Sequence, residues 1–377
     1  MSTEVPAVVG YAPQGAPNWR YETVKIRREV KEHEVQVRLI STGICHTDVF
    51  LSCVPHGAAG IEYPKIFGHE GAGYVEAVGS AVTRAKVGDP VVLSYAYCQT
   101  CDICKDGHTA YCLSWQALNV PGEKDIFQSA TGEDAGGKFF GQSSFASKSI
   151  VQETSVVNVK DLVHNDDELK LIAPLGCGIM TGAGAVLNSA KARPHDIVLV
   201  TGIGAVGLGA ITAAKISGCR EIIAVDRVAS RLQIAKEFGA TQILDTSAPN
   251  TSLEDVPKLV NNQRISYVIE TTGIPAIIVS AAKVMGKNGK LVQIGIPPPG
   301  AELTIPFFGD FYSMNKSIEC HMLGDEEPKT LIPKILGWWR DGKFPLEKVV
   351  KFFPAKDVLQ GLHGMESGSA IKPVLVW

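Results

Sequence analysis

The run from Ile197 to Ile216 constrains the fold of this chain more than any other stretch, because Lys215 is its only charged residue. A segment of this length and composition could cross a lipid bilayer as one helix. Glycines divide the run at regular intervals, however, in the order IVLVTGIGAVGLGAITAAKI. Such glycines favour a sharp turn between a buried strand and a helix, and we adopt this interpretation.

The glycines of this run follow the spacing G-x-G-x-x-G, at Gly202, Gly204 and Gly207. In a strand–turn–helix unit they permit a tight turn, the approach of a pyrophosphate to the backbone, and close packing of helix on strand. Asp226 ends the next predicted strand, where its carboxylate would bind a ribose and repel a 2′-phosphate. The pattern predicts NAD binding over NADP, although Arg227 would favour a phosphate. A glycine-rich turn in a nucleotide-free domain is the alternative.

Strands and helices alternate from about residue 195 to residue 324. The expected buried strands are DIVLVT, EIIAVD, YVIETTG and KLVQIGIPPPG, and the expected helices are AVGLGAITAAKISG, ASRLQIAKEFG and PAIIVSAAKVMGKNG. This alternation predicts an α/β fold with a parallel sheet covered on both faces. Residues up to about 175 form short β-type runs between turns. The polar, glycine-rich stretch from Pro121 to Gly137 is predicted to be a loop.

Length and charge limit the class of protein. A chain of 377 residues suggests about two domains. The formal net charge is −3 and no block of Lys or Arg occurs, so neither nucleic acid nor a membrane is an expected partner. The N-terminal stretch lacks the pattern of a secretory signal, so we expect a cytoplasmic protein. Its nine cysteines would then be ligands or free thiols.

Four cysteines lie within the short stretch CQTCDICKDGHTAYC, with the spacing C-x2-C-x2-C-x7-C. They are Cys98, Cys101, Cys104 and Cys112. Four thiolates from one loop can complete a tetrahedral zinc shell that leaves no position for a substrate. The spacing therefore predicts a structural zinc site, with disulfides and an iron–sulfur cluster as weaker alternatives.

A catalytic zinc needs three protein ligands and one open position. The candidates are Cys45 in GICHTD, His69 in GHEGAG and Cys177 in PLGCGIM. A cysteine taken singly is more often a small buried side chain than a ligand. The residues alone do not show that these three meet in space.

Taken together, the motifs resemble the zinc-dependent alcohol dehydrogenases of the medium-chain dehydrogenase/reductase family along nearly the whole chain. They occur in the family's order: GICHTD, GHEGAGYVEAVG, the four-cysteine stretch, GCGIMTGAGAV, GIGAVGL and AIKPVLVW. The resemblance implies a GroES-like, β-rich catalytic domain at 1–180 and 325–377, and a Rossmann coenzyme domain at 181–324. The stretch IECHMLGDEEP, with Gly324 and Asp325, is most similar to benzyl (aryl) alcohol dehydrogenases.

The resemblance also implies roles around the catalytic zinc. The matching ligands are Cys45, His69 and Cys177. Glu70 matches an acid beside the metal, Asp48 a carboxylate that orients the ligand histidine, and Thr47 the hydroxyl that takes the proton of the alcohol. Zinc would lower the pKa of the alcohol, whose hydride passes to the nicotinamide.

Further residues match the family's cofactor contacts. His46 and Lys372 match cationic positions at the pyrophosphate, while Asp226 and Arg231 match ribose contacts. The residues expected around the nicotinamide are Thr181, Val206 and Ile296.

Positions near the substrate both follow the family and depart from it. Phe50 stands where many members carry a histidine that ends the proton relay, so the end of the relay is unassigned. Gln116 replaces an arginine of glutathione-dependent formaldehyde dehydrogenases, which argues against an anionic glutathione adduct. Aromatic residues expected at the pocket, suited to a planar substrate if they do not simply fill the core, are Tyr95, Tyr111, Phe139 and Phe140.

The expected activity is therefore an NAD-linked, zinc-dependent interconversion of a primary alcohol and its aldehyde, with an aromatic or bulky substrate and two zinc ions per chain. One alternative is a biosynthetic reductase of the same family acting on an unusual carbonyl, C=N or C=C bond. Another is a non-catalytic NAD-binding zinc protein. The chain length and the stretch LTIPFFGDFYSMN favour a homodimer.

Overall fold

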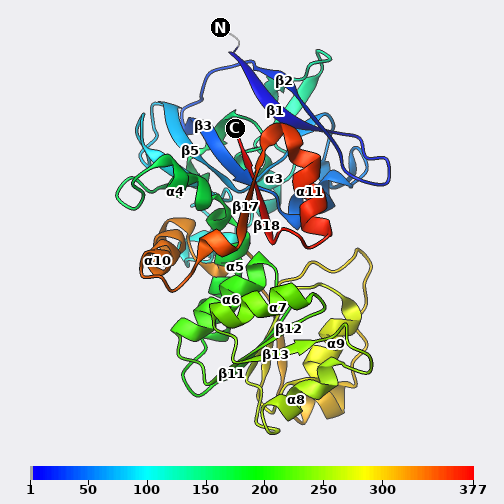
Figure 1. Cartoon of the computed structure of the whole chain (residues 1–377). Helices are drawn as coiled ribbons and strands as arrows, with labels where there is room; N and C mark the ends of the chain where they lie inside the picture. The colour runs from blue at the N-terminus through cyan, green and yellow to red at the C-terminus, as the bar shows by residue number, and fades with distance from the viewer. Residues whose placement is uncertain (1–2) are drawn as a thin grey trace. The chain divides into compact units, whose positions relative to one another are not determined.

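The structure is a computed structural model that describes residues 3–377 and divides into two compact units (Figure 1). Unit 1 comprises Met1–Cys177, Glu327–Gly337 and Val349–Trp377, and unit 2 comprises Gly178–Glu326 and Trp338–Lys348. The assignment of catalytic and coenzyme roles to 1–180 with 325–377 and to 181–324 stays a prediction.

Unit 1 contains a closed barrel and a seven-stranded sheet. The barrel has the order β1 (Thr3–Tyr11), β2 (Asn18–Ile26), β7 (Glu123–Gln128), β8 (Asp134–Gly137) and β4 (Lys65–Ile66). The sheet has the order β10 (Val156–Asn158), β6 (Pro90–Leu93), β5 (Gly71–Val78), β3 (Glu34–Gly43), β18 (Lys372–Val376) and β17 (Val350–Pro354), with β9 (Lys148–Gln152) paired to β3. Most neighbouring strands are antiparallel, which suits the short β-type runs of this part of the sequence.

Apolar residues at every second position of β3 form part of the hydrophobic core of the sheet. Val35, Val37 and Leu39 occupy every second position and share one buried cluster with Val75 and Val91 from the neighbouring strands. Successive side chains of a strand point to opposite faces, so this alternation puts one face of β3 into the core.

The prediction of a loop from Pro121 to Gly137 is wrong, because this stretch forms the β7–β8 hairpin of the barrel. Ile126 and Phe127 of β7 are completely buried and anchor the hairpin in the core. Its turn is closed by the backbone hydrogen bond from Ser129 N to Glu133 O (2.9 Å), with Gly132 in the left-handed region at φ 88°. Two adjacent buried residues were enough to overcome the polar composition around them.

Short helices connect the strands of unit 1. The α-helices are α1 (His46–Ser52), α2 (Asp102–Lys105), α3 (Trp115–Asn119), α4 (Asp166–Leu171) and α11 (Val358–Glu366), while α10 (Pro328–Arg340) starts in unit 1 and ends in unit 2. The 3-10 turns of unit 1 are η1 (Ala58–Gly60), η2 (Thr109–Tyr111), η3 (Phe139–Gly141), η4 (Glu153–Ser155), η5 (Ala173–Gly176) and η11 (Ala355–Asp357).

Unit 2 is a doubly wound α/β layer structure, as predicted. Its sheet has the parallel order β13 (Gln242–Asp245), β12 (Glu221–Asp226), β11 (Ile197–Thr201), β14 (Tyr267–Glu270), β15 (Lys290–Gln293) and β16 (Ser317–Cys320). Helices α6 (Ala205–Ile216) and α7 (Ala229–Phe238) cover one face, and α8 (Val256–Leu259) and α9 (Pro275–Val284) cover the other (Figure 1). The remaining elements are α5 (Gly178–Gly184), the π-helical turns η6 (Ala185–Ala190) and η8 (Phe307–Tyr312), and the 3-10 turns η7 (Leu253–Asp255), η9 (Leu323–Asp325) and η10 (Leu346–Lys348).

The apolar run Ile197 to Ile216 divides into β11, a turn and α6. Across residues 3–377, we find no helix with the length and apolar character that a bilayer crossing requires. The strand–turn–helix interpretation of this run is therefore confirmed.

Helices α5 and α6 approach each other closely at Gly182. A Cβ atom at this position would lie 1.8 Å from Val206 O. Gly209 on α6 makes the matching approach, because a Cβ there would lie 2.5 Å from Ile179 O. The two helices can pack at this distance only with glycine at both contact points.

We expect Gly182→Ala to lower the free energy of unfolding by about 1–3 kcal/mol, because the new methyl group forces the two helices apart. Gly337→Ala is the matched control: Gly337 lies in α10 with no heavy atom within 4 Å of an added Cβ, so alanine should leave stability equal or slightly higher. Urea denaturation of both variants measures the difference. Equal stability of the two variants would contradict the close packing of α5 on α6.

Candidate active site

Three segments of unit 1 bring Cys45, His69, Glu70 and Cys177 together. Each side chain offers one ligand atom, and these atoms all lie within 4.8 Å of one another. Cys45 immediately precedes α1, His69 and Glu70 lie between β4 and β5, and Cys177 follows η5. The three candidate metal ligands predicted from the sequence are thus neighbours, and Glu70 joins them.

The Asp48 carboxylate connects two of these segments. It accepts hydrogen bonds from Cys45 N (3.0 Å) and Gly68 N (3.0 Å), and its Oδ1 lies 2.8 Å from His69 Nδ1. The contact places the ring proton on Nδ1, which leaves the lone pair of Nε2 available for a metal ion. His69 Nε2 is buried and has no hydrogen-bond partner within the described part of the chain.

Hydrogen bonds, burial and neighbouring charges shift the pKa values of these ligands in different directions. The hydrogen bond with Cys177 is the main reason that the pKa of Cys45 lies well below its ordinary value. The same hydrogen bond, followed by burial, raises the pKa of Cys177 well above its ordinary value. Burial lowers the pKa of His69, but the charges of Asp48 and Cys45 outweigh it and raise this pKa. One of the two thiols is therefore readily ionised, the form in which cysteine binds metals.

Glu70 forms a buried ion pair with Lys372, with a distance of 2.9 Å between Oε1 and Nζ. Lys372 Nζ also donates to Ile44 O (3.2 Å). Burial raises the pKa of Glu70 to about 7, against the opposing charge of Lys372. Gly43 provides the space, because a Cβ there would lie 2.0 Å from Glu70 Oε2. The sequence did not indicate this pair, and the expected contact of Lys372 with a pyrophosphate stays a prediction.

Aromatic side chains cover the His69 imidazole. Phe140 stacks on it with ring centroids 4.5 Å apart, and Phe139 meets it edge-on at 5.8 Å. Trp115, which the sequence did not single out, packs edge-on against Phe140 at 5.4 Å. Of the other two expected pocket residues, Tyr95 is completely buried, with its hydroxyl 2.7 Å from Thr109 Oγ1, and Tyr111 is half-buried.

The remaining predicted residues of unit 1 lie along α1 and near it. His46 is exposed and Thr47 is half-buried, both in the first turn directly after Cys45. Phe50 is 39% exposed. His56 Nδ1 accepts a hydrogen bond from Tyr63 N (3.2 Å), so its ring is bound locally.

The second cysteine group consists of one compact loop. The sulfur atoms of Cys98, Cys101, Cys104 and Cys112 all lie within 4.8 Å of one another. Backbone amides donate to three of them: Cys101 N to Cys98 Sγ (3.3 Å), Cys104 N to Cys101 Sγ (3.4 Å) and Cys98 N to Cys112 Sγ (3.3 Å). Hydrogen bonds with Thr100 and Cys101 lower the pKa of Cys98 to about 5. Amide donors that stabilise thiolates suit a site holding a cation.

The glycine loop of unit 2 has the geometry that the motif requires. Gly202 has a φ of 84°, and a Cβ at Gly207 would lie 2.1 Å from Gly202 O. A Cβ at Gly204 would meet no heavy atom of residues 3–377 within 4 Å, so the backbone at the start of α6 is open. Asp226 accepts hydrogen bonds from Ile203 N (2.6 Å) and Val228 N (2.9 Å), which ties the end of β12 to this loop.

Four more predicted cofactor residues lie in unit 2. Arg231 is in α7, and its Nε is buried without a hydrogen-bond partner in the region that the structure describes. Thr181 is buried in α5, Val206 is in the first turn of α6, and Ile296 is 58% exposed after β15. The contacts expected of them with a nucleotide stay predictions.

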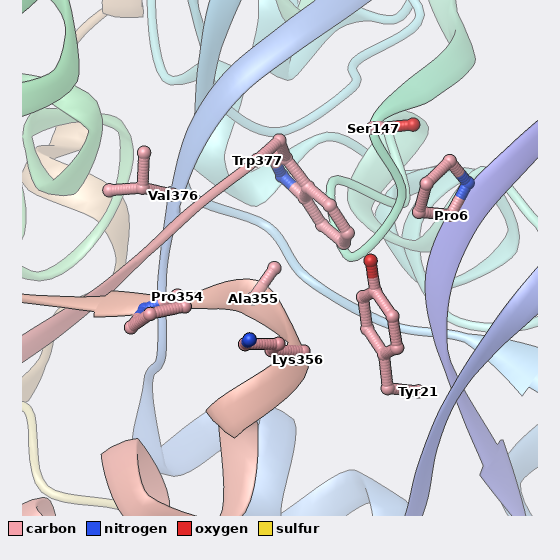
Figure 2. A pocket seen from close by; sticks show the side chains of 8 residues that line it. All are labelled: Pro6, Tyr21, Ser147, Pro354, Ala355, Lys356, Val376 and Trp377. Atoms are coloured by element: carbon pink, nitrogen blue, oxygen red, sulfur yellow. The ribbon is translucent and has the colours of Figure 1, made fainter.

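A separate cavity of unit 1 contains none of the predicted site residues. Figure 2 shows the side chains that line it, Tyr21 and Trp377 among them. The residues that line it are Pro6, Tyr21, Ser147, Pro354, Ala355, Lys356, Val376 and Trp377. It has no cysteine, histidine or carboxylate side chain, so the candidate active site remains the group around His69.

Comparisons with known proteins agree with this geometry. The alcohol dehydrogenase GroES-like domain matches residues 31–161, and the zinc-binding dehydrogenase family matches residues 205–337. Geraniol dehydrogenase of Castellaniella defragrans is 35% identical over 92% of this chain and 91% of its own length. This chain belongs to the zinc-containing medium-chain alcohol dehydrogenases.

Solved structures support the same assignment. A zinc-binding alcohol dehydrogenase domain protein from Burkholderia ambifaria is 36% identical, with a TM-score of 0.92 over 100% of this chain and 99% of its own. Benzyl alcohol dehydrogenase from Acinetobacter calcoaceticus is 33% identical, with a TM-score of 0.89 over 99% of each chain. An alcohol dehydrogenase from E. coli CFT073, solved with NADH, shows the fold alone at 20% identity and a TM-score of 0.79 over 99% of each chain.

As a zinc-dependent alcohol dehydrogenase, the protein is an oxidoreductase acting on CH–OH groups, and the alternative of a non-catalytic NAD-binding protein is wrong. Its residues fit the metals of the family. Two thiols and one orphaned imidazole nitrogen form one candidate zinc site, with Glu70 beside them, and four thiols form the other. The open backbone at Gly204 fits a nucleotide phosphate at the start of α6.

We expect Cys104→Ala to lower the zinc content from two ions per chain to one, because three thiolates hold structural zinc far more weakly than four. The melting temperature should fall as well, since structural zinc contributes to folding stability. Cys219→Ala is the control, because Cys219 belongs to neither ligand group. Elemental analysis of the purified proteins measures the ratio, and two zinc ions in Cys104→Ala would disprove a metal role for the cysteine loop.

Proposed function

We propose that this dehydrogenase interconverts a primary alcohol and its aldehyde with NAD(H), and that the alcohol carries an aromatic or other bulky unsaturated group beside the carbinol. The observation that carries the proposal is the convergence of Cys45, His69 and Cys177, with the rings of Phe139 and Phe140 packed against His69.

Three protein ligands leave one position for the oxygen of the substrate. Cys45, His69 Nε2 and Cys177 would hold the catalytic zinc ion, and the four-cysteine loop would hold the structural one. When bound, the catalytic ion supplies Lewis acidity, which lowers the pKa of the alcohol and polarises the aldehyde carbonyl.

Residues of α1 supply orientation and proton transfer. The Asp48 carboxylate fixes both the ring angle and the tautomer of His69. Thr47 follows Cys45 by two residues and is half-buried, so its hydroxyl is the group we assign to take the proton of the alcohol. Phe50 cannot take up that proton because its side chain has no hydrogen-bonding group. Water or the cofactor ribose would therefore pass the proton on.

Unit 2 supplies the nucleotide site in this proposal. The open backbone at Gly204 lies at the start of α6, a 12-residue helix whose N-terminal amides favour a pyrophosphate. The buried Asp226 carboxylate at the end of β12 would bind ribose hydroxyls and repel a 2′-phosphate, which favours NAD over NADP. Arg231, with its unpartnered buried Nε, would gain a partner from the bound nucleotide.

The names of two relatives support a narrower substrate class for this proposal. These relatives are named for geraniol and for benzyl alcohol, both primary alcohols with unsaturation next to the carbinol. Phe139 and Phe140 pack against His69 and are 0% and 4% exposed, so they would form part of the aromatic wall behind this ligand, which suits such a planar group. We therefore assign allylic and benzylic primary alcohols as the substrate class.

The zinc-replete protein should form NADH from benzyl alcohol or geraniol, with much lower activity for ethanol and for NADP as cofactor. Cys45→Ser should reduce turnover to background while the protein still binds NAD, because the catalytic metal loses a ligand. Absorbance at the NADH band measures the rate, and Cys219→Ser is the matched control. No turnover of either alcohol by a protein with confirmed zinc and NAD binding would overturn this substrate class.

We also propose a homodimer formed through one surface of unit 2. Phe307, Phe308 and Tyr312 of η8 are 70%, 74% and 72% exposed. They precede β16, the edge strand of the six-stranded sheet, which also exposes Ile318. Exposed aromatic residues beside an unpaired strand edge are typical of a protein interface. A second copy of the chain fits both features, because two edge strands can pair with each other.

The double variant with Phe307→Ser and Phe308→Ser should be a monomer, whereas the wild type should have twice the chain mass of 40.3 kDa. Phe352→Ser is the control, since Phe352 is also exposed, at 47%, but lies in β17 of unit 1. Size-exclusion chromatography with light scattering measures the mass. A double variant that keeps the wild-type mass would place the interface elsewhere.

A further inference from the structure

Residues 67–70, which join β4 to β5 and include His69, pair with no strand of the described residues, so their backbone carbonyls need other donors. Residues 142–145 donate hydrogen bonds to three of these carbonyls and to that of Ile66, the last residue of β4. The hydrogen bonds are Ser143 Oγ to Ile66 O (2.6 Å), Phe145 N to Phe67 O (3.0 Å), Ser144 N to Gly68 O (2.9 Å) and Gln142 Nε2 to His69 O (2.9 Å). Four consecutive carbonyls that end at the ligand histidine are therefore held by one short segment.

Gln142 is the member of this segment that reaches a second part of the site. Its side chain is completely buried and makes three hydrogen bonds. Nε2 donates to His69 O and to Ser94 O (2.8 Å), and Oε1 accepts from Gly71 N (3.1 Å). The amide thus binds the backbone on both sides of Glu70 and joins it to the residue after β6.

Ser94 continues the connection to the other ligand segment. Its hydroxyl donates to Gly176 O (2.6 Å), and Gly176 directly precedes Cys177. A Cβ at Gly176 would lie 2.0 Å from Leu93 O, so η5 is pressed against the end of β6 at this point. A continuous chain of buried hydrogen bonds runs from His69 through Gln142 and Ser94 to the residue before Cys177.

We infer that Gln142 is a positioning residue that, with Ser94, sets the separation of the His69 and Cys177 ligand atoms. The inference rests on the proposed metal site of Cys45, His69 and Cys177. Neither Gln142 nor Ser94 belongs to the ligand group, so each acts through the backbone of a ligand segment. Groups that orient metal ligands typically change metal affinity by about 10–100-fold when removed.

The chemistry of an amide suits this position. Two carbonyl oxygens and one amide nitrogen face the side chain, so two donors and one acceptor are required. A carboxylate would place negative charge against both carbonyls, and a leucine would leave three buried backbone groups without partners.

The test uses Gln142→Leu and Ser94→Ala, each with a matched control. Asn119→Leu removes another buried amide with three backbone hydrogen bonds, to Ala96 N, Ala96 O and Trp115 O. Ser129→Ala removes a buried hydroxyl that bonds Thr131 Oγ1 and Glu133 O and belongs to neither ligand segment. Cobalt takes the place of zinc as the probe metal. The first two readouts are the absorption spectrum of cobalt at the site with both cysteine and histidine ligands, and the rate at which a chelator removes that cobalt. The third readout is the melting temperature.

Cobalt should leave Gln142→Leu about 10–100-fold faster than the wild type, with an altered spectrum, and Ser94→Ala should change both in the same direction by less. The controls should lose melting temperature but keep the wild-type spectrum and release rate. Unchanged cobalt release in Gln142→Leu, with a melting temperature lowered as in Asn119→Leu, would show a purely structural role and overturn the inference. If Gln142→Leu does not fold, Ser94→Ala decides the question: faster cobalt release supports the inference, and unchanged cobalt release overturns it. A wild type without a mixed-ligand cobalt spectrum would instead overturn the metal site itself.

Discussion

The geometry of unit 1 depends on ionisable groups that meet at one largely buried point. Cys45, His69, Glu70 and Cys177 meet there, with Lys372 paired to Glu70. Charges taken out of water are costly unless others of opposite sign balance them. The shifts follow this demand: the pKa values of Cys177, His69 and Glu70 are raised, and that of Cys45 is lowered. A zinc ion held there would add positive charge beside both sulfur atoms.

The sheet of unit 1 explains how residues so far apart in the chain meet. β3 ends at Gly43, just before Cys45, and β5 begins at Gly71, just after Glu70. These strands are antiparallel neighbours with Thr42 opposite Gly71, so both ligand segments leave the sheet at the same end. β6 also ends there, because Ala72 pairs with Val92, and Ser94 then reaches the segment of Cys177. The loops at one sheet end carry the chemistry, and the strands set their spacing.

Prediction from the residues alone succeeded where the information was local, whereas the meeting of Cys45, His69 and Cys177 could be expected only from the family resemblance. The glycines after β11 and the four clustered cysteines needed only their own spacing. The β7–β8 hairpin was missed because Ile126 and Phe127 are its only adjacent large apolar pair, and their burial comes from the barrel around them. The pair of Glu70 and Lys372 spans almost the whole chain, and Gln142 stands in a polar stretch, GQSS, that looks like an ordinary turn. Only tertiary contacts give these residues their roles.

Both units hold their functional loops in the same way, with buried carboxylates that accept hydrogen bonds from backbone amides. Asp48 binds Cys45 N and Gly68 N, and Asp226 binds Ile203 N and Val228 N. Glu270, completely buried at the end of β14, binds Thr272 N and Gly273 N in the same manner. Each carboxylate fixes a loop while its charge is satisfied by amide donors. The loops can therefore adopt an irregular backbone and still hold a defined geometry. A metal or phosphate site needs an irregular backbone because its ligands must all point to one place.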